Sequence, residues 1–107
     1  MERVAFLLGI RPGSEQTYKE RHDQIWPEMV QALRAAGAHN YSIYFDLDRR
    51  RLFAYLEAEP DFTTFVQRIS ADPVNARWQD AMRDLMDVSV DPQTNWPPRL
   101  EEAFHID

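Results

Sequence analysis

The alternation of apolar and polar residues along the chain predicts strands separated by helices. Four stretches have the alternation and the β-branched or aromatic content typical of strands: about residues 3–11, 40–46, 51–59 and 101–106. The first is followed by Pro12, which cannot continue a strand ladder. A polar turn from Asp46 to Arg50 joins the second strand to the third, which favours a hairpin.

Helical periodicity follows the first strand. Ser14 can cap a helix that runs to Gly37, a residue suited to the left-handed position after a helix end. Pro27 lies inside this pattern and has no backbone N–H to donate to the preceding turn. We therefore expect a kink or a break between Gln24 and Glu28, so that two helical pieces result.

The remaining helices complete an order of elements that defines a fold class. Two helices are predicted from Asp61 and from Asp72-Pro73, each with capping chemistry at its start. The order is then β-α-β-β-α-β in one domain of residues 1–107. This is the α+β, ferredoxin-like arrangement, in which an antiparallel sheet carries helices on one face.

Both faces of the predicted sheet carry apolar side chains. In the second strand Tyr41 and Ile43 point to one face and Tyr44 to the other, and in the third strand Phe53 opposes Leu52. An antiparallel sheet with one face in water shows a cleaner alternation. We therefore expect a second copy of the chain to cover the open face, which makes the protein a homodimer.

Composition and charge exclude several classes of function. The net charge of −6 provides no basic field for a phosphate backbone, so we expect no nucleic-acid partner. The chain has no cysteine, which excludes disulfides and thiolate chemistry and fits a reducing compartment; we expect the cytoplasm. The apolar stretch of residues 4–10 is too short to span a membrane and has no cleavage site, so no membrane partner is expected.

Candidate chemistry lies on the apolar face of the first predicted helix. Tyr18 and His22 share this face with a set of apolar side chains: Ile25, Trp26, Met29, Val30 and Leu33. Because Tyr18 and His22 are four residues apart, their side chains are neighbours on successive turns. Two interpretations remain open, a functional site and a pair of structural core residues with buried partners. The pairing of a phenol with an imidazole favours the site.

Other motifs of catalytic chemistry do not occur. The three histidines, His22, His39 and His105, have no metal-ligand spacing, so we predict no metal site. Three glycines are too few for a phosphate-binding loop, and no serine has the surroundings of a nucleophile. Trp78 has polar neighbours, but a packing role is the more common one for such a residue.

Four segments, in order along the chain, carry a resemblance to a known family. Residues 18–28 read Tyr-Lys-Glu-Arg-His-Asp-Gln-Ile-Trp-Pro-Glu, and residues 37–44 read Gly-Ala-His-Asn-Tyr-Ser-Ile-Tyr. Arg77-Trp78 and the ending Glu-Ala-Phe-His at residues 102–105 follow. Together they span nearly the whole chain and resemble the L-rhamnose mutarotase family.

The resemblance implies a fold, an activity and a set of site residues. It implies a dimeric α/β barrel of ferredoxin-like chains that works without a cofactor. It also implies exchange between the α and β anomers of a 6-deoxy-L-hexose, with L-rhamnose as the first expectation. By position, His22 is then the proton donor, and Tyr18, Tyr41 and Trp78 contact the sugar.

One position departs from the family pattern. Gln79 stands where the family usually has a second indole beside Trp78. The sequence Arg-Trp-Gln is similar to a branch of the family associated with L-fucose. A carboxamide forms directional hydrogen bonds where an indole offers a flat surface, so we expect Gln79 to bind the sugar and to influence the choice between L-rhamnose and L-fucose.

Residue chemistry and fold leave alternatives open. A histidine whose pKa is near neutrality can deliver a proton to a ring oxygen or take one from the anomeric hydroxyl. The partner in that transfer is a tyrosine, a carboxylate or a water. The same fold also hosts cofactor-free or haem-using monooxygenases. A sugar-binding domain without catalysis is a further alternative.

Overall fold

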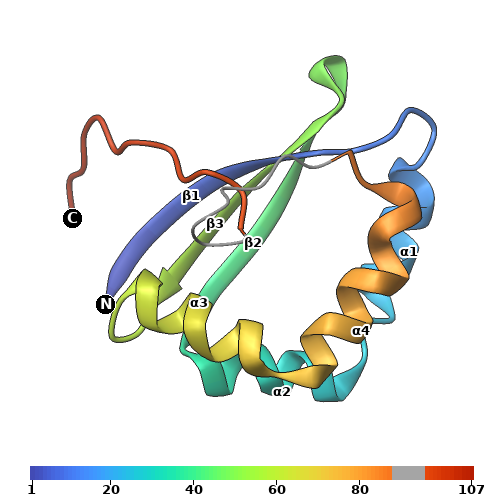
Figure 1. The fold of residues 1–107 in the computed structure, drawn as a ribbon. Coiled ribbons are helices and arrows are strands. Elements are labelled where there is room, and N and C mark those ends of the chain that lie inside the picture. Colours follow the sequence, from blue (N-terminus) through green and yellow to red (C-terminus); the bar gives the residue numbers. More distant parts are fainter. Residues whose placement is uncertain (88–95) are drawn as a thin grey trace.

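The computed structural model describes residues 1–87 and 96–107, which form one sheet with helices packed on it (Figure 1). The sheet has three antiparallel strands: β1 (Glu2–Gly9), β2 (Ala38–Asp46) and β3 (Arg51–Ala58). Four α-helices accompany it: α1 (Glu15–Asp23), α2 (Pro27–Ala36), α3 (Phe62–Ala71) and α4 (Pro73–Met82). The strand order is β1-β3-β2, so β3 is central and β2 lies at an edge. The predicted α+β, ferredoxin-like class is confirmed.

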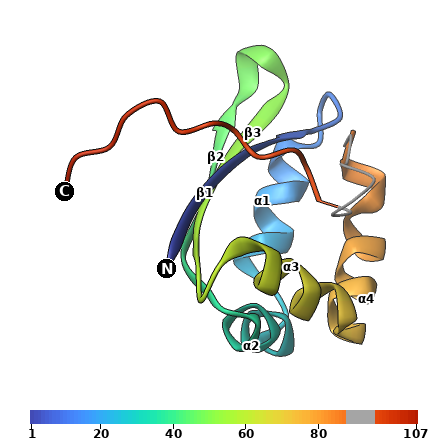
Figure 2. The same ribbon diagram turned by 60° about the vertical axis from the view of Figure 1, so that its left-hand side comes forward.

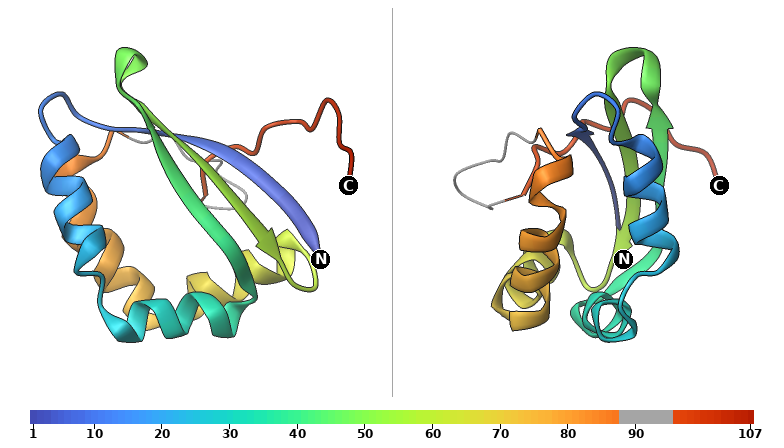
Figure 3. Two further views of the ribbon diagram at one scale, coloured as in Figure 1. Left: turned by 180° about the vertical axis from the view of Figure 1, so that it is seen from behind. Right: turned by 90° about the vertical axis from the view of Figure 1, so that its right-hand side faces the viewer.

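All four helices lie on the same side of the sheet. Figure 3 shows the α1–α2 pair beside the α3–α4 pair, and in both views the two pairs leave the opposite face of the sheet without a helix. The helices thus cover one face of the sheet. No helix in the described part of the chain is long and apolar enough to cross a membrane.

The predicted break before Pro27 is confirmed. α1 ends at Asp23, and α2 begins at Pro27 with Trp26 as its extended N-terminal cap. Proline suits the first helical turn because its missing N–H has no partner there in any residue. The break turns the chain between the two pieces, so that α1 and α2 follow different directions along the sheet.

Gly37 ends α2 and cannot be replaced by a larger residue without a change in the backbone. Its φ is 114°, in the left-handed region that favours glycine. A β-carbon at this position would also overlap the backbone carbonyl of Glu59. The Glu59 N–H donates to the Gly37 carbonyl over 2.9 Å, which ties the start of β2 to the end of β3.

The two later helices begin at the predicted caps. The Asp61 carboxylate accepts a hydrogen bond from the Thr64 N–H over 2.8 Å. The Asp72 carboxylate accepts one from the Val74 N–H over 2.9 Å. Each cap satisfies an N–H that has no partner within its helix.

The strands have two distinct faces, as their alternation predicts. The inner face, toward the helices, carries residues that are fully or almost fully buried: Val4, Phe6, Leu52, Ala54, Leu56 and Ala58. The outer face carries the alternating neighbours of these residues: Arg3, Ala5, Leu7, Tyr44, Phe53 and Tyr55. Phe65 and Ile69 of α3 complete the core against the inner face. One face of the sheet therefore supplies the core, and the other is open.

The expectation of a last strand near residues 101–106 is wrong. Residues 101–107 have no strand pairing. The backbone contacts with β1 are an isolated bridge between Phe6 and Arg99 and the hydrogen bond from the Leu100 N–H to the Ala5 carbonyl, and ion pairs of Arg3 with Glu102 and of Arg99 with Glu2 add to them. Figure 2 shows the end of the chain leaving β1 and projecting on the side away from the helices. Alternation favours an extended backbone, but it does not supply a partner edge.

Candidate functional site

The inner side of the molecule contains a cavity of about 860 Å³. Its walls come from α1, α2, α4 and the edge strand β2, and the residues that matter most for chemistry are Tyr18, His22, Tyr41, Asn75, Trp78 and Gln79. This volume lies in the range of small-molecule sites in proteins. All five predicted site residues, Tyr18, His22, Tyr41, Trp78 and Gln79, line this one cavity. The tertiary structure thus brings together residues from three separate elements.

Tyr18 and His22 form a stacked pair on α1. Their ring centroids are 4.2 Å apart, with an angle of 24° between the ring planes. Tyr18 is buried, with 5% of its surface exposed, while His22 is half-buried at the cavity wall. Phe45 of β2 contacts the Tyr18 ring edge-on, with 6.0 Å between centroids. This packing holds the imidazole in one orientation.

The hydrogen bond of His22 fixes its tautomer. Nδ1 lies 3.0 Å from the backbone carbonyl oxygen of Tyr18. A carbonyl oxygen only accepts, so Nδ1 carries the hydrogen and donates it. In the neutral ring, Nε2 is then the unprotonated nitrogen, with a lone pair available to a ligand.

Burial also sets the charge of His22. Loss of solvent lowers the pKa of His22 below 6.5, and this effect outweighs the Tyr18 carbonyl and the Asp23 carboxylate, which act in the opposite direction. The ring is therefore neutral at pH 7, and Nε2 is ready to take a proton. Asp23 itself pairs with Lys19 over 3.0 Å at the rim of the cavity.

Tyr18 and Tyr41 supply hydroxyl groups that keep their protons. Burial raises the pKa of both phenols well above the usual value of 10, and the proximity of the two groups raises that of Tyr18 further. Tyr41 points from β2 to the inner side, where it meets Phe6 edge-on with 6.4 Å between centroids. Both phenols are therefore hydrogen-bond donors at neutral pH.

Trp78 forms an aromatic wall beside His22. The two rings meet edge to face, with 5.3 Å between centroids and an angle of 83°. Trp26 packs on the other side of Trp78 in the same way, with 5.2 Å between centroids. The sequence places Trp26 on the apolar helix face but gives no sign that it supports Trp78, because the two are far apart in the chain.

Gln79 has a partner that the sequence analysis did not identify. The Gln79 amide donates to the Asn75 side-chain oxygen over 3.3 Å, and both residues line the cavity. They are four residues apart on α4, a spacing that makes side chains neighbours on a helix and could have revealed the pair. The two carboxamides therefore form one polar patch in the same cavity as Trp78.

Arg21 is a second residue that sequence reasoning missed. Its guanidinium donates to both oxygens of Asp84, over 2.9 and 3.2 Å, and to the Ala81 carbonyl. These bonds tie α1 to the end of α4 and to the 3₁₀ turn Arg83–Leu85 that follows it. The bonds thus connect the helix that carries His22 to the helix that carries Trp78, and no local sequence signal connects residues 63 positions apart.

The described residues contain no group of three or more His, Cys, Asp or Glu side chains that could hold a metal ion. Two of the histidines pair with single carboxylates: His39 with Glu59 over 2.8 Å and His105 with Asp107 over 2.8 Å. The polar groups of the cavity are those of proton transfer and hydrogen bonding.

The chain is similar to known proteins over its whole length. A family model described as L-rhamnose mutarotase matches residues 3–106. The L-rhamnose mutarotase of Phocaeicola vulgatus is 38% identical over 107 residues, and that of Bacillus subtilis is 39% identical over 110 residues. In both comparisons the alignment covers 100% of this chain and 100% of the relative.

A solved structure extends this similarity to three dimensions. The crystal structure of the L-rhamnose mutarotase from Formosa agariphila matches with a TM-score of 0.80 at 37% sequence identity. The match covers 100% of each chain. The comparison of sequences and the comparison of structures thus both find proteins described as L-rhamnose mutarotases.

Proposed function

The chain belongs to the L-rhamnose mutarotase family, and we propose that it interconverts the α and β anomers of L-rhamnose by acid–base catalysis at His22. The observation that carries the proposal is the neutral His22, with its free Nε2, in a cavity lined by Tyr18, Tyr41 and Trp78. The choice of L-rhamnose as substrate rests on the relatives named above, and the proposed mechanism rests on the geometry of the cavity.

The reaction requires only the movement of protons and one pair of electrons. A proton leaves the anomeric hydroxyl, the bond from C1 to the ring oxygen breaks, and the ring oxygen receives that electron pair and a proton. The open aldehyde turns about its C1–C2 bond, and the reverse steps close the ring on the other face. No electron is gained or lost, so we propose a reaction without metal or cofactor.

His22 is suited to both proton transfers. Its neutral Nε2 takes a proton from one sugar oxygen, and the resulting imidazolium returns a proton to another. The hydrogen bond from Nδ1 to the Tyr18 carbonyl keeps Nε2 directed to the ligand throughout. The imidazolium is the proton donor of this scheme, in agreement with the role that the family resemblance implies.

The two phenols complete the polar contacts. Because their pKa values are raised, Tyr18 and Tyr41 remain protonated and donate hydrogen bonds to sugar oxygens. A donor placed at the ring oxygen stabilises the negative charge that develops as the C1–O bond breaks. We propose Tyr18 and Tyr41 as substrate-binding residues in this sense.

Trp78 and Gln79 would contact different parts of the sugar. The Trp78 ring offers an apolar surface to the C–H side and the methyl group of a 6-deoxy sugar. The Gln79 amide, held by Asn75, offers hydrogen bonds to a hydroxyl. L-Fucose shares the methyl group of L-rhamnose but differs from it in the orientation of the C2 and C4 hydroxyls. L-Fucose is therefore the second candidate substrate. The observation that favours it is the hydrogen-bonded pair of Gln79 and Asn75.

We also propose that the protein is a cytoplasmic homodimer. The outer face of the sheet exposes Tyr44 and Phe53, with 62% and 38% of their surfaces accessible. Large apolar side chains that share an exposed face favour association. The absence of cysteine from all 107 residues fits a reducing compartment.

Anomer-exchange NMR tests the proposed activity. The protein is added to equilibrated L-rhamnose, L-fucose, D-glucose and D-galactose, and the exchange rate between α and β resonances is measured by saturation transfer. We expect acceleration for L-rhamnose, a smaller one for L-fucose, and none above the buffer rate for the two D-hexoses. Line broadening of L-rhamnose without faster exchange would identify a sugar-binding protein and contradict the proposal.

A further inference from the structure

A second cavity, of about 660 Å³, adjoins the one described above. The two cavities share the residues that we place around the sugar, among them His22, Tyr41 and Trp78. They also share Trp96, which follows α4 in the chain. Because Trp96 lies in the wall of both cavities, it borders the space where they meet, and His22 borders the same space.

Three aromatic rings of the core hold Trp96 in place. Its ring meets Phe6 of β1 edge to face, with 5.7 Å between centroids. Phe65 and Phe62 of α3 pack on it in the same way, with 5.4 and 6.1 Å between centroids. Trp96 is nevertheless only half-buried. One part of the indole therefore packs on the core, and the other part is accessible from the cavities.

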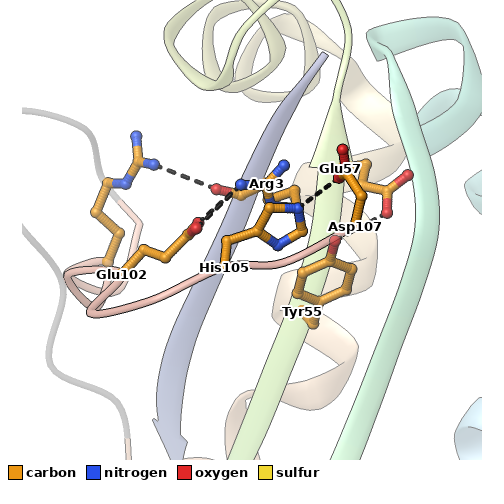
Figure 4. A network of polar contacts seen from close by, with 7 residues as sticks. Arg3, Tyr55, Glu57, Glu102, His105 and Asp107 are labelled. Atoms are coloured by element: carbon orange, nitrogen blue, oxygen red, sulfur yellow. Dashed lines mark hydrogen bonds and ion pairs between the residues drawn. The ribbon is translucent and has the colours of Figure 1, made fainter.

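The backbone that carries Trp96 is anchored to the sheet. Pro97 is buried directly after it, and a residue that precedes proline is restricted to extended conformations. The backbone N–H of Leu100 donates to β1 over 2.7 Å. Arg3 of β1 pairs with Glu102 over 3.0 Å, as Figure 4 shows. These contacts fix the stretch of chain from which the indole projects.

Trp78 and Trp96 border the shared space from different sides. Trp78 of α4 meets His22 of α1, with 5.3 Å between ring centroids. Trp96 packs instead on the rings of β1 and α3. Tyr41 adjoins this second group, because its ring contacts Phe6 with 6.4 Å between centroids. A sugar held by His22 and Tyr41 would therefore have an indole on each side.

The wall beside Trp96 is apolar. Phe6, which contacts the indole, lines the second cavity together with Leu8 and Pro97. Phe6 and Leu8 lie on the same face of β1, since they are two residues apart in a strand. None of these three side chains has a hydrogen-bond donor or acceptor. This wall therefore suits an alkyl group better than a hydroxyl group.

Two arginines of the second cavity are bound to other parts of the protein. Arg11 donates to the Met86 carbonyl over 3.1 Å. Arg83 pairs with Asp80 over 3.2 Å. A sugar hydroxyl that used either guanidinium would compete with these bonds.

A 6-deoxy sugar has one group that fits an apolar wall. In the pyranose, the methyl carbon C6 is attached to C5, next to the ring oxygen. When the ring oxygen lies at His22, the methyl group is two bonds away and must be received by a wall close to His22. Burial of a methyl group against an indole is favourable, whereas a hydroxyl in the same place exchanges its bonds to water for none.

We propose that Trp96, together with Phe6, receives the methyl group of the 6-deoxy sugar and selects against the sugar that carries a hydroxyl at C6. The proposal rests on the function proposed above and names the residues that read the methyl group. Trp78 then contacts the sugar from α4, and Trp96 contacts it from the side of β1 and α3.

Exchange rates for two sugars test the selection. L-Rhamnose and L-mannose differ only at C6, which carries a methyl group in the first and a hydroxymethyl group in the second. The preference is the ratio of their kcat/KM values. We expect Trp96→Ser to lower the preference for L-rhamnose by about tenfold, through a higher KM for L-rhamnose. Trp96→Phe keeps an aromatic ring and should retain most of the preference.

Phe62→Leu is the matched control for lost packing. It removes a ring from the cluster that holds Trp96. Within the part of the chain that the structure describes, Phe62 lines neither cavity. Thermal unfolding should show that Phe62→Leu lowers stability, while its preference should equal that of the unmodified chain. Equal losses of preference in Phe62→Leu and Trp96→Ser would assign Trp96 a packing role and overturn the proposal.

NMR of the unmodified chain tests the contact without relying on catalysis. The chain has three tryptophans, Trp26, Trp78 and Trp96, and each gives one indole N–H signal, which single substitutions to phenylalanine assign. Titration with L-rhamnose should shift the Trp96 signal, and a nuclear Overhauser effect should connect the sugar methyl group to the Trp96 ring. Titration with L-mannose should shift it less. A titration with L-rhamnose that shifts the Trp78 signal and leaves the Trp96 signal in place overturns the proposal.

The outcomes separate this proposal from the one on which it rests. A chain that exchanges L-rhamnose anomers, with the same preference in Trp96→Ser, overturns the role of Trp96 and leaves the proposed activity. A chain that does not accelerate the exchange overturns the activity. In that case the titrations still decide whether Trp96 receives the methyl group.

Discussion

The inner and outer faces of the sheet are built from the same strands but are completed in different ways. On the inner face, Leu52, Ala54 and Leu56 of β3 are fully buried under the helices. On the outer face, Phe53 lies between them in sequence, and 38% of its surface is exposed. One strand thus contributes a dry core on one side and an uncovered apolar surface on the other.

The difference teaches how so small a chain can combine a cavity on one face of its sheet with an exposed apolar surface on the other. The helices enclose the inner face and leave a cavity in which burial lowers the pKa of His22. No helix among residues 1–87 and 96–107 covers the outer face, and its polar contacts, such as Arg3 with Glu102, are exposed ion pairs that contribute little to stability. The proposed chemistry uses the enclosed side, and the proposed association uses the open one.

The largest effect should follow from a change on the inner face. His22→Asn removes the group that transfers protons but retains a side chain that can donate to the Tyr18 carbonyl. We expect the exchange rate for L-rhamnose to fall by about 10³-fold, within the range of general acid–base catalysis. Saturation-transfer NMR measures the rate, and sedimentation should show an unchanged dimer. A rate close to that of the unmodified chain would remove His22 from the mechanism.

The same substitution on the outer side is the control for this prediction. His105→Asn, near the end of the chain and outside the cavity, should leave the rate unchanged. The pH dependence sharpens the test, because burial lowers the pKa of His22 below 6.5 and the neutral ring starts the reaction. The exchange rate should therefore be constant around pH 7. It should fall as the solution is made more acidic, and the pH at half the maximal rate should lie below 6.5. In the His22→Asn variant this fall should disappear.

A change on the outer face should act on association. Phe53→Asp places a charge at the centre of the surface that we propose to be covered by the second copy. We expect the dimer dissociation constant to rise by about 100-fold, because burial of a large apolar side chain is replaced by burial of a charge. Gln67→Asp, on the exposed side of α3, introduces the same charge away from the sheet. Equal dissociation constants for the two variants would contradict the proposed interface.

The smallest effect concerns the choice of sugar within the cavity. Gln79→Trp replaces a directional amide by a flat apolar ring beside Trp78. We expect the ratio of exchange rates to shift toward L-rhamnose over L-fucose by about tenfold, which corresponds to roughly 1.4 kcal/mol. Gln79→Leu separates loss of the amide from gain of the indole. If the ratio is the same in all three proteins, Gln79 does not determine specificity.

Local signals predicted most of the elements. Pro27, the cap residues Asp61 and Asp72, and Gly37 each act within a few residues of their own position, so the boundaries that depend on them were correct. The last strand was wrong because a strand requires a partner edge, which no local signal specifies.

For the candidate site, the sequence by itself determined the apolar helix face that carries Tyr18 and His22, through the spacing of residues along one helix. Family resemblance added Tyr41, Trp78 and Gln79. Only the tertiary structure decided that these residues share a cavity, that Arg21 ties α1 to the turn after α4, and that His22 is neutral with Nε2 free. The physical reason is range: helix capping and periodicity act between residues close in sequence, whereas burial and the contacts that set a pKa depend on residues brought together from distant parts of the chain.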